Sequence, residues 1–226
     1  MPGKIGAIIM AAGAGRRMGG RPKSLLLRDS VPLIERQLRA LAQIGVSHAV
    51  VVLGHHSVCI EPVLVALQSQ FGDSLDLRWA LNPLPDDGPG SSLRVGLAAL
   101  SPELDAVLVT LADQPLVEAA DMRAVLAGWE GRGPEVELVV PSFEGEPGHP
   151  VVFGAGVRDA VVAMSGGAGL RDWRKAHSAQ VQMLPVDHAR HTLDIDTEAD
   201  RAALAERYGI ALEWPAGLDA GVAASG

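Results

Sequence analysis

A loop rich in glycine and in basic residues follows the first apolar run of the chain. That run, Ile5–Met10, predicts a buried strand. The loop after it holds four glycines and four cations, namely Gly13, Gly15, Gly19, Gly20, Arg16, Arg17, Arg21 and Lys23. Glycine lets backbone N–H groups turn inward on an anion, and the cations add attractive charge. We therefore predict a phosphate-binding loop; the alternative is a surface turn of solvated arginines, a role left open for Arg16 and Arg21.

Neither of two common phosphate-binding patterns fits this loop. A P-loop needs Gly-Lys followed by Ser or Thr, whereas Lys23 follows Pro22. A dinucleotide fingerprint could begin at Gly13, but it would leave Arg17 and Lys23 without a role. In an enzyme that transfers a phosphoryl group, positioning and electrostatic stabilisation carry the catalysis, so both cations would be catalytic there by neutralising a triphosphate.

Two further places in the sequence offer carboxylates. Asp113 directly follows the apolar run Ala106–Leu111, where it could hold Mg²⁺ or cap the next helix. Asp194 and Asp196 are two residues apart, so in an extended segment they share a face and repel each other unless a cation joins them. We predict Asp113 and Asp196 as metal ligands, with capping of the last helix as the alternative for Asp196.

The segment between Asn82 and Ser92 has the composition of a loop that reads a nucleotide base. Gly88 allows a backbone to approach a flat ring, and the hydroxyls of Ser91 and Ser92 can bond its polar edge. One of these serines is also the expected N-cap of the following helix.

Histidines provide candidates for the second substrate. His149 and Pro150 lie in a Gly-His-Pro segment, which is either an acceptor site or a plain turn. His55 and His56 follow another apolar run and are candidate acceptor contacts, and a metal role is not expected for them.

Alternating elements are needed to bring these residues together. Strands are predicted at Ile5–Met10, His48–Leu53, Leu75–Leu81, Ala106–Leu111 and Glu137–Val140, and helices at Pro32–Ile44, Ser57–Gln70, Ser91–Leu100 and Glu118–Trp129. This order predicts a three-layer, doubly wound α/β fold with a mostly parallel sheet. The glycine loop, His55, Asn82 and Asp113 all follow strands, so they should meet at the carboxyl edge of the sheet.

The later part of the chain continues the same fold without a linker. We predict strands near Pro150–Phe153 and Val181–Leu184, and helices near Ala155–Met164, Ala168–His177 and Glu198–Tyr208. Residues 1–214 are therefore predicted to form one domain, followed by a flexible Gly- and Ala-rich tail at 215–226.

Composition narrows the functional classes. The chain of 226 residues has a net charge of −8, which argues against a nucleic-acid partner. It has no apolar run long enough to span a membrane and no signal-peptide pattern, so we expect a cytoplasmic protein. The single cysteine, Cys59, excludes an internal disulfide and is expected to be a packing residue.

Five segments, in order, resemble the nucleotidyltransferases with the MobA-like fold. They are Met10–Lys23 (MAAGAGRRMGGRPK), Gly88–Leu93 (GPGSSL), Leu111–Pro115 (LADQP), Gly148–Phe153 (GHPVVF) and Asp194–Thr197 (DIDT). The Ala-Ala-Gly form of the loop is most similar to the molybdenum cofactor cytidylyltransferases. The resemblance implies a Rossmann-like fold of the nucleotide-diphospho-sugar transferase kind. It also implies that CMP is transferred from CTP, with Mg²⁺, to a phosphorylated pterin of the molybdopterin type, releasing pyrophosphate.

The same resemblance assigns roles to residues. A nucleotide site is implied at Ala11, Ala12, Gly13, Gly15, Arg17, Lys23, Asn82, Gly88, Ser91 and Ser92. Lys23 would contact the α-phosphate, Asp113 would be the principal metal ligand, and His149 with Pro150 would face the pterin. A molybdoenzyme or its chaperone would be a downstream partner.

One departure from the family pattern concerns the acceptor. The family carries Gly-Asp-x-Gly-Ala-Arg before a helix, whereas this chain has Gly167 at the acidic position. The alternatives are therefore another phosphorylated acceptor such as a sugar or alcohol phosphate, GTP in place of CTP, or a non-enzymatic chaperone that holds the cofactor. Lys23 and Asp113 argue against the chaperone.

Overall fold

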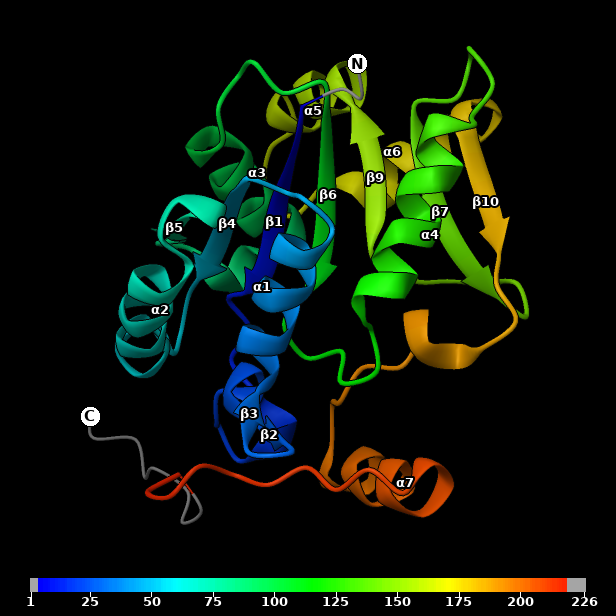
Figure 1. Ribbon diagram of the computed structural model, residues 1–226. Helices are drawn as coiled ribbons and strands as arrows, with labels where there is room; N and C mark the ends of the chain where they lie inside the picture. The colour runs from blue at the N-terminus through cyan, green and yellow to red at the C-terminus, as the bar shows by residue number, and fades with distance from the viewer. Residues whose placement is uncertain (1–3, 219–226) are drawn as a thin grey trace.

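A single eight-stranded sheet organises the molecule, as the computed structural model of residues 4–218 shows (Figure 1). The strands are β1 (Ile5–Ala11), β4 (His48–Leu53), β5 (Asp76–Leu81), β6 (Ala106–Leu111), β7 (Leu138–Phe143), β8 (Glu146–Pro147), β9 (Val151–Gly154) and β10 (Val181–Pro185). Their order is β10-β7-β9-β6-β1-β4-β5, with β8 paired to β7. Strand β9 runs antiparallel to its neighbours β6 and β7, while β1, β4, β5 and β6 run parallel.

Helices cover both faces of this sheet, which confirms the predicted three-layer α/β fold (Figure 1). Helices α1 (Leu33–Gln43), α2 (Ser57–Phe71) and α4 (Ala119–Glu130) pack on one face, and α3 (Pro89–Ala99), α5 (Ala155–Val162) and α6 (Leu170–Ala176) pack on the other. The central strands are apolar almost throughout because neither of their faces meets water.

A third, smaller core lies beneath the carboxyl edge of the sheet. There α7 (Glu198–Tyr208) and the last described segment cross under the small hairpin of β2 (Leu27–Arg28) and β3 (Val31–Pro32) (Figure 1). The buried side chains of this cluster are Met18, Leu26, Leu33, Leu116, Ile195, Leu204, Leu212 and Trp214. It joins the glycine loop to the end of the chain and so fixes where the Asp194–Asp196 segment lies.

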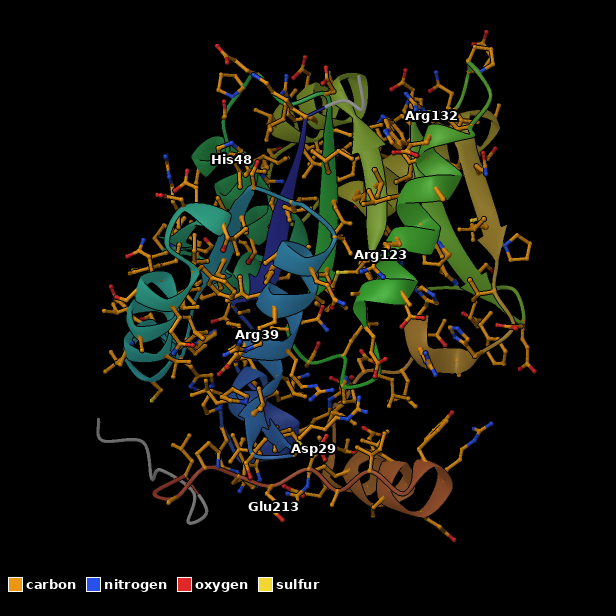
Figure 2. All side chains as sticks on the ribbon, in the orientation of Figure 1. Asp29, Arg39, His48, Arg123, Arg132 and Glu213 are labelled. Carbon is orange, nitrogen blue, oxygen red and sulfur yellow. The ribbon has the colours of Figure 1, made fainter. Side chains whose placement is uncertain are left out.

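The last described segment is tied to the hairpin by the backbone. Leu27 and Glu213 exchange two backbone hydrogen bonds, of 2.8 and 2.9 Å, and Figure 2 shows Glu213 beneath the part of the hairpin that carries Asp29. Leu218 packs against the core, and its N–H donates to the carbonyl of Pro215. The remainder of the predicted tail, 219–226, lies outside the described residues, so flexibility of the tail stays a prediction.

Two local expectations were wrong. Helix α3 begins at Pro89 with Gly88 as N-cap, so neither Ser91 nor Ser92 caps it; proline suits the first helical position because its fixed φ is already helical. Cys59 is exposed, because α2 turns Ile60 and Leu64 toward the core instead. Among residues 4–218 no helix is long and apolar enough to cross a membrane.

Leu204 tests how firmly α7 is held. Its side chain is buried in the third core, so Leu204→Ala should lower the free energy of unfolding by about 2–4 kcal/mol, measured by denaturant titration. Val162→Ala, which truncates an exposed side chain on α5, should change it by less than about 0.5 kcal/mol. Equal effects of the two substitutions would show that α7 contributes little to the fold.

Candidate active site

The glycine loop leaves β1 at the carboxyl edge of the sheet and is built from left-handed turns. Gly15, Gly19 and Gly20 have φ values of 60°, 71° and 68°, which side chains other than glycine rarely adopt. A Cβ at Gly15 would also overlap the carbonyl oxygen of Arg21. Met18, fully buried in the third core, anchors the loop from below. The sequence therefore folds locally into a fixed loop that exposes Gly13 and Arg17.

Lys23 lies between two carboxylates from distant parts of the chain. Its Nζ is 2.5 Å from Asp113 Oδ2 and 2.8 Å from Asp196 Oδ1, and Arg17 forms an ion pair with the other oxygen of Asp196. The loop after β1, the end of β6 and the segment before α7 thus meet at one ammonium group. The predicted catalytic residues and the predicted metal ligands form a single cluster.

The pKa shifts in this cluster follow from its charges. Burial acts to lower the pKa of Lys23, but Asp113 and Asp196 outweigh it and the pKa is raised. Burial acts to raise the pKa of Asp196, but Lys23 and Arg17 outweigh it and the pKa is lowered. Lys23 therefore stays protonated and Asp196 stays ionised around neutral pH.

Asp194 stands apart from these ion pairs. Burial, followed by repulsion from Asp113 and Asp196, raises the pKa of Asp194. Helix α7 is capped by Thr197, whose hydroxyl accepts from the N–H of Asp200 at 3.1 Å, so Asp196 does not serve as the cap. This leaves the Asp196 carboxylate available to the cluster.

The predicted base-reading residues hold one another. The buried Asn82 amide donates to the hydroxyls of Ser91 at 2.7 Å and Ser92 at 2.9 Å, and its oxygen accepts from the N–H of Leu84 at 3.0 Å. Gly88, the N-cap of α3, has a φ of 96°. These side chains fix the course of the loop, and direct contact with a base stays a prediction.

This loop abuts the Gly166–Gly169 segment, which contains the departure from the family pattern. A Cβ at Gly167 would lie 2.7 Å from the carbonyl oxygen of Asp87, and one at Gly90 would overlap the carbonyl of Ala168. Arg94 on α3 donates to the carbonyl of Ala168 at 2.6 Å and also to that of Gly166. The loop at Gly88–Gly90 and the segment Gly166–Gly169 are therefore packed backbone against backbone.

A cavity of about 350 Å³ lies next to His149 and Pro147. The guanidinium side chains of Arg171 and Arg174 from α6 line it, together with apolar residues such as Val140. Burial, reinforced by Arg174, lowers the pKa of His149 to about 4, so the imidazole is neutral at physiological pH. The cavity therefore offers apolar residues, two permanent cations and the acidic side chain of Glu146, which suits an organic molecule that carries both an anionic group and polar groups.

Several polar side chains near the loop act within the structure. Arg21 donates to Glu198 and to the carbonyl of Met18 and stacks over Trp214, so it secures α7. Asp86 contacts two residues from distant segments. Its Oδ1 is 2.7 Å from Arg16 Nη2 and 3.2 Å from His55 Nε2.

His56, considered above as an acceptor contact, instead lies against the glycine loop. Its Nε2 is 2.9 Å from the carbonyl oxygen of Ala14. The sequence predicts no role for Asp86, Arg94, Arg174 or His191, because each contacts a distant segment that its local sequence does not reveal.

The fold and the cluster at its carboxyl edge agree with the NTP-transferase superfamily. Within it, the MobA-like NTP transferase domain matches residues 7–181, and the chain belongs to that family. Nucleotidyltransferases of this family generally use divalent metal ions.

Comparison with individual proteins agrees with this assignment. The bifunctional protein GlmU of Mycobacterium avium (strain 104) is 31% identical over 150 residues, which are 66% of this chain but only 30% of that protein. Rv0371c from Mycobacterium tuberculosis H37Rv has 27% identity and a TM-score of 0.70, covering 90% of this chain and 98% of that one. A structure of Rv0371c with manganese is also similar, with 26% identity, a TM-score of 0.67 and coverage of 90% and 98%.

The buried histidine gives a prediction for stability against pH. Between pH 6.5 and about 4 the unfolded chain takes up a proton at His149 that the folded chain does not, so stability should fall as the pH falls through this window. In His149→Asn the free energy of unfolding should depend less steeply on pH. The difference in free energy of unfolding between wild type and variant should change by up to about 3 kcal/mol across this window.

Denaturant unfolding at a series of pH values measures this effect. His191 and Asp196 titrate in both proteins, so the difference isolates residue 149. His177→Asn, which replaces an exposed histidine, should keep the wild-type slope. Parallel curves for wild type and His149→Asn would show that the imidazole is not held neutral.

Proposed function

We propose that this protein is a magnesium-dependent cytidylyltransferase that joins CMP from CTP to a phosphorylated pterin of the molybdopterin type and releases pyrophosphate. The observation that carries the proposal is the convergence of Lys23, Asp113 and Asp196 beneath the glycine loop. This arrangement combines a glycine-rich loop that could hold phosphates, an ammonium group and two carboxylates in one place.

The carboxylates fit a magnesium ion. Oxygens of Asp113 and Asp196 approach one point closely enough that the Lys23 ammonium contacts both, and an all-oxygen set is what Mg²⁺ prefers. Asp113 and Asp196 would hold the ion. Once bound, it would supply charge neutralisation at the phosphates.

Lys23 and Arg17 would then change partners. In the free protein both cations pair with Asp196, and Arg17 is largely exposed and able to turn. With CTP bound, they would face the triphosphate while backbone N–H groups of the loop hold its oxygens. An oxygen of the acceptor phosphate would attack the α-phosphorus, and the bond from that phosphorus to the pyrophosphate oxygen would break.

The acceptor part of the proposal rests on the cavity beside His149. Arg171 and Arg174 would pair with the acceptor phosphate, and the apolar wall suits a flat ring. A sugar or alcohol phosphate is the alternative acceptor, because Gly167 lacks the acidic side chain of the family pattern. A cofactor chaperone without activity is a weaker candidate, since it has no need for the Lys23 cluster. If the acceptor is the pterin, a molybdoenzyme or its chaperone is the proposed recipient of the product.

Nucleotide choice tests the cytidylyl assignment. The Ala-Ala-Gly form of the loop and the Gly88–Leu93 segment favour CTP, so CTP should outcompete GTP when pyrophosphate release is followed with a molybdopterin-type acceptor. Asp113→Asn should be inactive with every nucleotide and serves as the control. A tenfold preference for GTP, about 1.4 kcal/mol, would place the chain among guanylyltransferases.

Lys23→Ala tests catalysis at the cluster. Charge shifts toward pyrophosphate during transfer, so loss of the ammonium should lower kcat by about 100-fold while KM for the nucleotide changes less. Lys4→Ala, at the opposite edge of the sheet, should retain wild-type kinetics. A variant with raised KM and unchanged kcat would mean that Lys23 only binds the nucleotide.

A further inference from the structure

Asp121, His188 and His191 form a compact cluster outside the nucleotide site. Asp121 lies in the first turn of α4, and the two histidines lie in the turn after β10, which includes a short 3₁₀ helix at Ala189–His191. One potential ligand atom from each residue lies within 4.8 Å of the others. Asp121 and His191 are almost completely buried.

The distances in this cluster suit a small ion. Asp121 Oδ1 is 3.4 Å from His188 Nε2 and 3.9 Å from His191 Nε2. Ligands of a tetrahedral Zn²⁺ at about 2.0–2.1 Å stand about 3.3 Å apart, so only a small movement of the side chains would close the site. The two imidazole rings are nearly parallel, with 7° between their planes and 5.4 Å between their centres.

Hydrogen bonds already orient two of the three ligands. His191 Nδ1 is 3.0 Å from the carbonyl oxygen of His149; a carbonyl only accepts, so Nδ1 carries the proton and Nε2 presents its lone pair to the cluster. Asp121 Oδ2 accepts from the N–H of Glu118 at 2.9 Å, which leaves Oδ1 for the cluster. A carbonyl behind a histidine and a backbone donor behind a carboxylate are the usual supports of metal ligands.

The third ligand is less constrained. The Nδ1 atom of His188 is buried and has no hydrogen-bond partner among the described residues. The ring is 37% exposed, so rotation about its χ angles can present either nitrogen.

The charges also match a cation. A metal ligand must present a free lone pair, and Nε2 of His191 does so because Nδ1 holds the proton. Arg190 Nη1 lies 3.7 Å from Asp121 Oδ1 and balances its charge in the free protein. Arg190 is 43% exposed and can turn to solvent when another cation arrives.

We propose that Asp121, His188 and His191 bind a first-row divalent ion such as Zn²⁺, with a fourth position open to water. Two imidazoles and one carboxylate favour such ions over Mg²⁺, which prefers oxygen ligands. This site is distinct from the all-oxygen pair Asp113 and Asp196 and does not depend on the proposed function.

The ion would connect helix α4, the turn that carries His188 and His191 and, through the backbone of His191, the loop at His149. The carbonyl oxygen of His191 accepts from the N–H of His149 at 2.8 Å and from the side chain of Gln114 at 2.8 Å. A metal bound to His191 would therefore brace both the acceptor loop and the chain just after Asp113 against α4. A metal ion that binds the folded chain and not the unfolded chain also raises the stability of the folded protein.

The test uses the full chain after removal of metal by a chelator. Zn²⁺ is added in the presence of excess Mg²⁺, in competition with a chromophoric chelator, and Tm is measured in parallel. The wild type should bind about one equivalent of Zn²⁺ and gain Tm. His188→Asn, at a half-exposed position, should fold normally but bind Zn²⁺ at least about tenfold more weakly.

Three controls make the result specific. His48→Asn, which removes a histidine 3.3 Å from Asp76 at the far edge of the sheet (Figure 2), should not alter zinc affinity. Arg190→Gln should keep or strengthen binding, because it removes the competing cation. Asp113→Asn should retain the zinc equivalent.

Two results would overturn the proposal. One is equal zinc affinity of wild type and His188→Asn, including the case in which both bind only weakly. The other is loss of the zinc equivalent in Asp113→Asn, which would place the ion at the nucleotide site.

Discussion

The position of Lys23 between Asp113 and Asp196 is the interaction on which the rest of the site depends. Without a cation at this point, two half-buried carboxylates would repel each other. The ammonium allows three distant segments to close in the free protein. Under the proposed function, a metal ion would replace the ammonium between the two carboxylates, and Lys23 would then face the phosphates. One group would thus serve both folding and catalysis.

Backbone packing provides the second constraint. The loop at Gly88–Gly90 and the segment Gly166–Gly169 approach so closely that side chains at Gly90 and Gly167 would collide with carbonyl oxygens. Arg94 fastens the contact through two carbonyls. Such packing holds the two segments at a fixed spacing, and under the proposed function in-line transfer would require that spacing. It also gives a physical reason for glycine at position 167.

Other polar residues turn out to support the site from behind. The Asn82 amide donates to two serine hydroxyls. Arg21 donates to Glu198 and stacks on the Trp214 ring. His191 joins the acceptor loop to α4 through its carbonyl and its Nδ1. Arg17 and Lys23 are therefore set among side chains that are themselves held by hydrogen bonds, and this limits the cost of reorganisation on binding.

The sequence by itself determined the layers of this fold and the place of the glycine loop. Apolar runs such as His48–Leu53 can only be buried strands between helices, and parallel strands send the residues after them to one edge. Tertiary structure alone decided which cations pair with which carboxylates, that Pro89 begins α3, and that Asp121 meets His188 and His191. These contacts join residues far apart in the chain, and local periodicity carries no information about side-chain partners across such separations.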